Sequence, residues 1–210
     1  MAAFDPIFAL VMKHEGYYAN LVNDQGGMTY AGIARNINPS WQGWRIVDAA
    51  ISMRGRDLPN NYKIDNGVLD QYVRDFYLEL WRKSMAGSIN NQQVAALYFD
   101  FYVNSGKAIR EIQKVLVALG YQVTVDNYPG AQTINAINSY PDQAYLHDAI
   151  KNGRIGYLNE VATYGQNASF LPGWMNRLAD FPNLSTAQKT VAVGTVLAVV
   201  LLGLYLLRKS

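Results

Sequence analysis

Cysteine is absent from this chain of 210 residues, and histidine occurs only twice, as His14 and His147. The absence of cysteine excludes disulfide bonds, thiolate nucleophiles and zinc sites that contain cysteine. Because the two histidines are far apart in the sequence, we expect neither a metal site nor a cofactor. Gly26-Gly27 is not followed by Lys and then Ser or Thr, as a phosphate-binding loop requires. The net charge of +2 gives no reason to expect nucleic acid as a partner.

Charged residues are also scarce, at 16% of the chain against about 25% in an average protein. Much of the shortage lies near the C-terminus, where the 18 residues 190–207 carry no charge. As a helix this segment would extend roughly 27 Å, close to the hydrocarbon thickness of a bilayer. Lys189 and Arg208-Lys209 flank it, as interfacial anchors do. We therefore predict a transmembrane helix over 190–207 rather than a buried core helix, preceded by a linker over 183–189.

The orientation of this anchor has two interpretations. We expect no N-terminal signal peptide, because Lys13 and Glu15 lie in what the sequence indicates is a capped helix. The two cations at the extreme C-terminus favour that end staying inside, which puts the rest of the chain outside. The alternative is a chain that is made in the cytoplasm and tethered there.

Helical periodicity dominates the rest of the sequence. Apolar residues recur at spacings of three and four over 68–81, 94–102 and 109–119, with Asn66 capping the first helix and Gly120 closing the third. Further helices are expected over 131–138, 142–164 and 173–180. Phe4-Asp5-Pro6 indicates another helix start, with Asp5 as the N-cap. A Gly-rich turn between Tyr17 and Ile33 is expected to join two short strands. The predicted fold class is mainly α.

The stretch from His14 to Ile33 carries the strongest functional signal. Glu15 lies at the end of the first helix, Asp24 follows in a turn-forming run, and Thr29 comes after it. Hydrolysis of a glycosidic bond needs one protonated acid at the leaving oxygen and a second group that handles water on the other face. The negative end of the helix dipole disfavours an ionised Glu15, which suits the acid. Taken singly, a Glu near a helix end is more often a surface residue, and an Asp before Gly-Gly is more often a turn residue.

Four motifs in order strengthen the functional interpretation. The first is Glu15-Gly16-Tyr17-Tyr18 followed by Asp24 to Ile33, DQGGMTYAGI; the others are residues 99–106 FDFYVNSG, 129–133 PGAQT and 170–177 FLPGWMNR. Together they resemble glycoside hydrolase family 108, the N-acetylmuramidases of bacteria and phages, over residues 4 to about 180. The chain departs from the family pattern twice. Tyr17 stands where the family has a second glycine, and Asp126-Asn127 stands where it has Asp-Gly.

This resemblance implies a lysozyme-like, two-lobed helical domain with a small β-hairpin region, to which the sequence adds a C-terminal transmembrane helix. We expect a catalytic lobe over 1–90 and a peptidoglycan-binding lobe over 91–182. The resemblance makes Glu15 the general acid, Asp24 the carboxylate that positions water or stabilises charge, and Thr29 a contact to water or sugar. Four further residues are expected to bind substrate in the sugar cleft: Tyr18, Tyr30, Asn104 and Trp174.

The expected function is that of a membrane-anchored peptidoglycan hydrolase that cleaves the MurNAc–GlcNAc β-1,4 bond by general acid/base catalysis. Its expected partners are peptidoglycan, a lipid membrane through 190–207, and virion or lysis proteins. The combination of a muramidase with a membrane anchor is consistent with a phage role in lysis or infection. The anchor would then lie in a viral internal membrane or in the bacterial inner membrane. Two alternatives stay open. One is a catalytically silent wall-binding or virion structural protein, and the other is a lytic transglycosylase that cuts the same bond.

Overall fold

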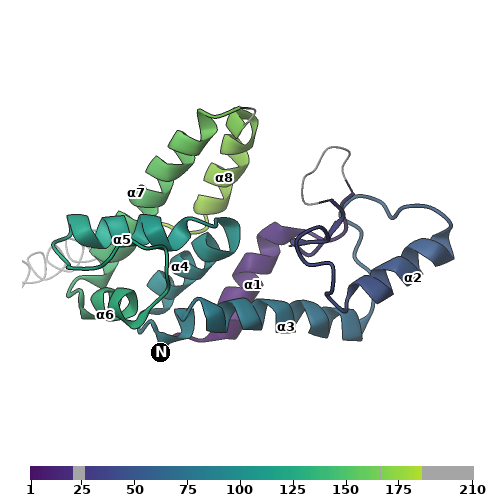
Figure 1. Cartoon of the computed structure of the whole chain (residues 1–210), viewed down its shortest axis with the longest axis horizontal. Coiled ribbons are helices and arrows are strands. Elements are labelled where there is room, and N and C mark those ends of the chain that lie inside the picture. The colour runs from purple at the N-terminus through teal and green to yellow at the C-terminus, as the bar shows by residue number, and fades with distance from the viewer. Residues whose placement is uncertain (21–26, 166, 186–210) are drawn as a thin grey trace, which may run out of the picture. The chain divides into compact units, whose positions relative to one another are not determined.

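The computed structural model describes residues 1–20, 27–165 and 167–185. They divide into two compact units, one over Ala2–Gly87 and a second from Ser88 onward. Helices are the main regular elements of both units, and a small antiparallel hairpin lies in the first (Figure 1). The prediction of a mainly α fold with a small β-hairpin region is therefore confirmed.

The first unit is built in the order α1 (Phe4–Glu15), β1 (Thr29–Tyr30), β2 (Ile33–Ala34), α2 (Trp44–Arg54) and α3 (Gly67–Lys83). As predicted, the side chain of Asn66 caps α3, accepting a hydrogen bond from the Leu69 N–H at 3.0 Å. α1 packs across α3 (Figure 1). The ring of Phe8 in α1 lies 5.7 Å from that of Tyr77 in α3, centroid to centroid. This packing fixes the axis of α1 and with it the place of its last residue, Glu15.

Two features of the first unit differ from the sequence prediction. α1 begins at Phe4, and its N-cap, Ala3, makes no side-chain capping bond. Asp5 is therefore not the N-cap: it lies in the first helical turn and forms an ion pair with Arg74 on α3. The helix α2 was not predicted at all. Its apolar face is short, because only Trp44 and Val47 are buried, and so its periodicity is weak.

The hairpin pairs Thr29 with Ala34 and Tyr30 with Ile33. Its turn has Ala31 at φ 51° and Gly32 at φ 74°, both in the left-handed region that a two-residue type I′ turn requires. This conformation is costly for alanine.

Two hydrogen bonds hold Ala31 in that conformation. Its N–H donates to the Tyr17 carbonyl at 3.2 Å, and its own carbonyl accepts from the Tyr77 hydroxyl at 2.9 Å. The hairpin turn thus lies at 31–32. The Gly-rich turn that was expected to join the strands falls largely on residues 21–26, outside the described residues.

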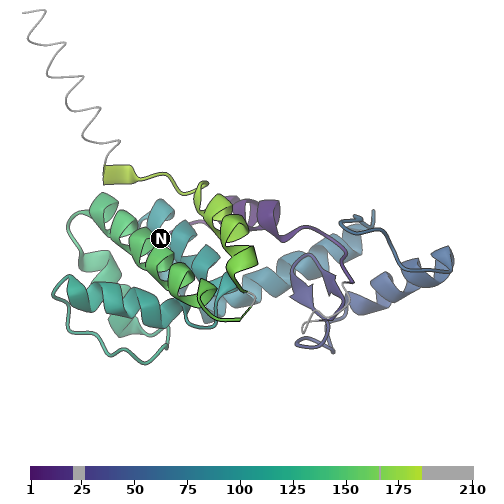
Figure 2. The same cartoon turned by 90° about the horizontal axis from the view of Figure 1, so that it is seen from above.

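The second unit contains α4 (Gln92–Asn104), α5 (Ala108–Ala118), α6 (Ala131–Ser139), α7 (Gln143–Ala162) and α8 (Leu171–Leu178), with short 3-10 turns η1 (Ala86–Ser88) before it and η2 (Asn167–Phe170) ahead of α8. α4 is its central helix, because every residue from Val94 to Phe101 is buried. α5 and α7 pack on α4, and α8 lies beside α7 (Figures 1 and 2). The helices expected over 94–102, 109–119, 131–138, 142–164 and 173–180 are present, with small shifts at their ends.

The predicted membrane anchor is not tested by the structure. Within residues 1–20, 27–165 and 167–185, no helix is long and apolar enough to cross a bilayer. The predicted span 190–207 and most of the linker 183–189 lie outside the described residues.

Candidate active site

Glu15 ends α1 and is half-buried. The chain leaves the helix through Gly16, at φ 64°. Asn61 then holds the next two residues: its Oδ1 accepts from the Tyr17 N–H at 2.9 Å, and its N–H donates to the Tyr18 carbonyl at 2.7 Å. The backbone that follows Glu15 is therefore fixed on a loop 44 residues further along the chain.

The hairpin turn closes over the Glu15 carboxyl group. A methyl group at the Cα of Gly32 would overlap Glu15 Oε2, and it would lie 2.7 Å from the Tyr77 hydroxyl and 2.9 Å from Glu15 Cδ. Only glycine fits here, both for this space and for its φ of 74°. Gly32 belongs to the first motif, but nothing in the sequence places it next to Glu15. The carboxyl group of Glu15, the hydroxyl of Tyr77 and the backbone of Gly32 thus form one tight cluster.

Of the other residues predicted for this site, Thr29 lies on the hairpin, Asp24 is not described, and two tyrosines are buried. Asp24 lies outside the described residues. Thr29 is half-buried on β1, and its backbone exchanges hydrogen bonds of 2.7 and 2.9 Å with Ala19. Tyr18 and Tyr30 were predicted to line the sugar cleft, but each is only 1% exposed. They are core residues, which leaves no ring face for a sugar, and burial raises the pKa of both hydroxyl groups.

A half-exposed tryptophan was missed by the sequence analysis. Trp41 and Phe76 line two adjoining hollows of about 330 and 290 Å³ between the 37–42 loop and α3. Glu79 lines both hollows. Sugar rings bind to surfaces that combine an aromatic face with carboxylates, because the face takes the apolar side of the ring and the carboxylates take its hydroxyl groups. Trp41 falls between the predicted elements, so no periodicity marked it.

Asn104 and Trp174, the other two predicted substrate contacts, lie together in the second unit. Both line a cavity of about 110 Å³ at the ends of α4 and α8 and along α7. Asn104 is exposed and Trp174 is half-buried. Two arginines, Arg154 and Arg177, line the same cavity. The arginines were not among the predicted site residues.

These arginines belong to a buried ion cluster that joins three helices. Asp100 on α4 is 0% exposed; its Oδ2 accepts from Arg154 Nη1 on α7 at 2.7 Å, and its Oδ1 accepts from Arg177 Nε and Nη2 on α8 at 2.9 and 2.7 Å. Asp100 lies in the motif FDFYVNSG and Arg177 in FLPGWMNR. The cluster therefore explains why two distant motifs occur together: their charges meet in the core.

A buried glutamine organises the loop that carries the second departure from the family pattern. Gln113 Nε2 donates to Asp126 Oδ1 at 2.8 Å and to Thr133 Oγ1 at 3.1 Å, and its Oε1 accepts from the Asn127 N–H at 2.9 Å. Asn127 has φ 63°, the left-handed conformation that glycine adopts readily. Asparagine is one of the few side chains besides glycine that adopt this conformation routinely, so Asn127 is compatible with the turn.

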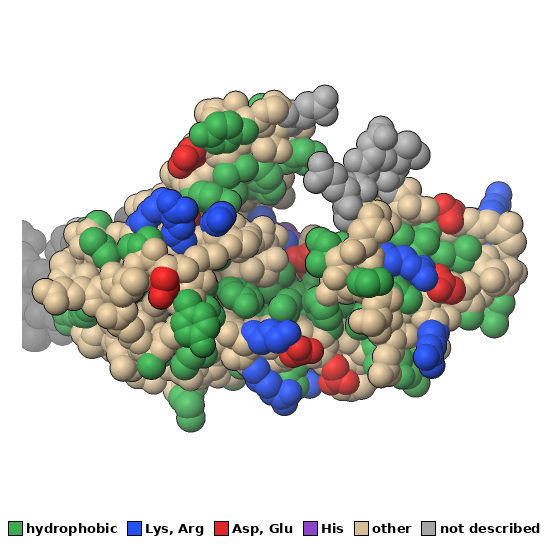
Figure 3. Space-filling view, viewed as in Figure 1, with side chains coloured by type: hydrophobic (Ala, Val, Ile, Leu, Met, Phe, Trp, Pro, Cys, Tyr) green, Lys and Arg blue, Asp and Glu red, His purple; other side chains and the backbone are tan. Residues whose placement is uncertain are grey.

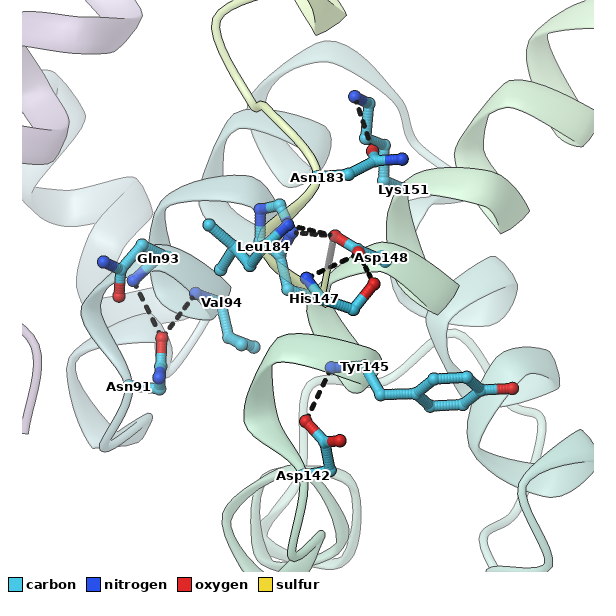
Figure 4. Close-up of polar contacts among 11 residues, drawn as sticks. Asn91, Gln93, Val94, Asp142, Tyr145, His147, Asp148, Lys151, Asn183 and Leu184 are labelled. Atoms are coloured by element: carbon cyan, nitrogen blue, oxygen red, sulfur yellow. Dashed lines mark hydrogen bonds and ion pairs between the residues drawn. The ribbon is translucent and has the colours of Figure 1, made fainter. Parts of the chain in front are cut away.

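The last described residues are held by a buried carboxylate on α7 (Figure 4). Asp148 accepts from the N–H groups of Leu184 and Ser185 at 2.9 and 3.0 Å, from the Ser185 hydroxyl, and pairs with His147 Nδ1 at 3.0 Å. Burial alone raises the pKa of Asp148, but the bonds from Ser185, His147 and Leu184 outweigh burial and lower the pKa to about 2. Asp148 thus binds the start of the C-terminal segment as a charged group.

A wide hollow of about 660 Å³, lined in part by Leu184, includes two helix-capping side chains, Asn91 and Asp142. Asn91 accepts from the N–H groups of Gln93 and Val94, and Asp142 accepts from that of Tyr145 (Figure 4). We assign it no chemistry. Within the described residues, no three Asp, Glu or His side chains form a group that would hold a metal ion.

Comparison with known proteins gives two family matches. Residues 8–106 match the model of glycosyl hydrolase 108, and residues 107–179 match that of a predicted peptidoglycan domain. Among solved structures, the structure of Brucella abortus SagA is similar in fold, with a TM-score of 0.56 and 21% sequence identity over 84% of this chain and 89% of that one. No curated protein matches. The chain therefore contains a glycosyl hydrolase 108 domain followed by a peptidoglycan domain, and it is a glycoside hydrolase that acts on peptidoglycan.

Proposed function

We propose that the chain cleaves the β-1,4 bond between MurNAc and GlcNAc, with Glu15 as general acid. The supporting observation is the closure of the 31–32 turn on the Glu15 carboxyl group, within the segment that matches the hydrolase family. A general acid must be held at a fixed distance from the leaving oxygen. The end of α1, the Asn61 loop and the Gly32 backbone together restrict where this carboxyl group can be.

In the proposed step, Glu15 gives its proton to the bridging oxygen as the bond from the anomeric carbon to that oxygen breaks. Water adds its oxygen to the anomeric carbon and passes a proton to the carboxylate of Asp24. The helix dipole at the end of α1 disfavours the ionised form of Glu15, which is the direction that a proton donor requires. Thr29 contacts the water or the sugar, and Asn104 and Trp174 bind other parts of the substrate.

The test is the rate of peptidoglycan digestion by Glu15→Gln, with Glu160→Gln as the matched control. The amide cannot donate the proton, so we expect a loss of about a hundredfold or more. Glu160 is exposed on α7 and is not among the residues that line the cavity beside Trp174, so its variant should keep the wild-type rate. A folded Glu15→Gln variant with a near-normal rate would remove Glu15 from the acid role.

The products decide between the two reactions at this bond. Hydrolysis leaves a reducing MurNAc end, whereas a lytic transglycosylase leaves a 1,6-anhydro ring because no water is added. We expect reducing ends. An anhydro product would assign the chain to the transglycosylases with the same Glu15 acid.

We further propose that residues 190–207 anchor the enzyme in a membrane, for a phage role in lysis or infection. The support is the sequence: 18 residues without a charge, flanked by cations. Replacing Leu197 and Leu201 with Arg should release the protein from membranes, because each central charge costs about 2.5–3.5 kcal/mol on insertion scales. Arginine at Ile37 and Met53, which are 74% and 89% exposed, adds the same charge elsewhere and should leave it bound. Equal fractionation of the two double variants would contradict the anchor.

A further inference from the structure

The cavity beside Asn104 and Trp174 is lined by a buried arginine that has one unpaired donor. Arg154 is 3% exposed, and its Nη1 donates to Asp100 at 2.7 Å. Its Nε–H is buried and has no hydrogen-bond partner among the residues that the structure describes. Buried donors are nearly always paired, and an unpaired one on a charged group is especially unfavourable. The arginine thus offers a donor that the protein itself does not use.

The charges around Arg154 also favour the binding of an anion in this cavity. Burial lowers the pKa of Arg154, Asp100 opposes this, and the neighbouring Arg177 guanidinium lowers it again. The two arginines share the single carboxylate of Asp100. None of the described residues that line the cavity is acidic. An anion that enters the cavity would therefore meet two guanidinium groups that share one carboxylate, Asp100, which is not itself a lining residue.

The walls of the cavity fit a small group that is partly apolar. Phe101, Tyr157 and Trp174 contribute aromatic side chains, and the Ser105 hydroxyl donates to the Tyr157 hydroxyl at 3.1 Å. The ring of Trp174 is stacked on that of Phe170, which is 57% exposed. Hydrophobic side chains are also visible over the α7–α8 pair in Figure 3. At about 110 Å³, the space equals that of three or four waters of about 30 Å³ each. A terminal carboxylate with one or two carbons fills it.

We propose that this cavity binds the free carboxylate of a peptidoglycan peptide stem, with Arg154 as its recognition residue. The inference rests on the proposed function, since peptide-bearing glycan is then the substrate. Planar guanidinium groups are suited to carboxylates, and a terminal alanine would place its methyl group against Trp174 and Phe101. The cavity makes the enzyme sensitive to the peptides of the wall as well as to its sugars.

The direct test is a titration of the full chain with N-acetyl-D-alanyl-D-alanine and with its C-terminal carboxamide. Binding is followed by NMR through the Nε–H signal of Arg154 and the indole N–H signal of Trp174. We expect the acid to move both signals and the amide to bind at least about tenfold more weakly, because hydrogen bonds to charged groups are the stronger ones. Equal affinity for acid and amide, or an Arg154 signal that does not move, would overturn the proposal.

A second test separates the cavity from the catalytic step. Arg154→Lys should raise KM on intact peptidoglycan several-fold without changing kcat, and it should leave the cleavage of peptide-stripped glycan unchanged. Arg110→Lys replaces an exposed arginine of the same unit and should change neither. An equal loss on both substrates would give Arg154 a purely structural role. If the wild-type protein cleaves neither substrate, the proposed function fails, but the titration still shows whether the cavity binds the carboxylate. If Arg154→Lys does not fold, the titration of the wild-type protein is again the deciding test.

Discussion

Replacing Gly32 with Ala should inactivate the enzyme by moving one carboxyl group. Gly32 is in the hairpin turn at φ 74°, and the new methyl group would overlap Glu15 Oε2. It would also come within 2.7 Å of the Tyr77 hydroxyl, which donates to the Ala31 carbonyl. Both neighbours must shift to accept it.

The structure allows the loss of stability and the loss of rate to be estimated separately. Alanine in the left-handed region costs about 1–2 kcal/mol, and weakening the Tyr77 hydrogen bond adds about 1 kcal/mol. We therefore expect a loss of roughly 2–3 kcal/mol in the free energy of unfolding. Glu15 Cδ would lie 2.9 Å from the methyl carbon, whereas carbon atoms prefer about 3.5–4.0 Å. The carboxyl group must then retreat by roughly 0.6–1 Å, and a displacement of this size costs about a hundredfold in rate.

Gly55→Ala provides the matched control. Gly55 follows α2 at φ 69°, and a methyl group there would have nothing within 4 Å. It therefore carries the same backbone cost of about 1–2 kcal/mol without touching Glu15. The assay compares initial rates of peptidoglycan digestion for the two variants, with urea unfolding and circular dichroism as measures of stability.

The two variants should differ in rate but not in their backbone cost. Gly55→Ala should keep the wild-type rate despite its lower stability, and Gly32→Ala should lose it while still folded. If a folded Gly32→Ala variant digests the wall as fast as Gly55→Ala does, the position of the Glu15 carboxyl group is not what limits the reaction.

Two predictions concern the second unit. The pKa of Asp148 is about 2 in the folded protein and about 3.9 in the unfolded chain, so ionised Asp148 adds about 2–3 kcal/mol to the free energy of unfolding. This contribution should be complete above about pH 5 and should vanish as the pH falls through 2. Unfolding of wild type and Asp148→Asn measured against pH should converge in acid; a constant gap would contradict this. Asp100→Asn should lower the free energy of unfolding, measured by urea denaturation, by about 3–5 kcal/mol, because two buried guanidinium groups lose their counter-charge. A loss below about 1 kcal/mol would mean that solvent reaches these groups.

Local patterns in the sequence predicted most of the helices. Asn66 caps α3 as expected, because capping involves residues only three positions apart. Asp5 was wrongly assigned as a cap, because its actual partner, Arg74, lies on another helix. α2 was missed because two buried residues give too weak a period. The prediction for 190–207 depends on local composition alone and remains a prediction.

The sequence by itself determined the resemblance to the family, the order of the helices other than α2, and the place of Glu15 at the end of the first helix. These follow from spacing along the chain and from motifs that are read in order. Only the tertiary structure decided that Gly32 lies against Glu15, that Tyr18 and Tyr30 are core residues, and that Asp100 joins Arg154 to Arg177. Each of these depends on contacts between segments far apart in the chain, and no local periodicity encodes which distant side chains meet.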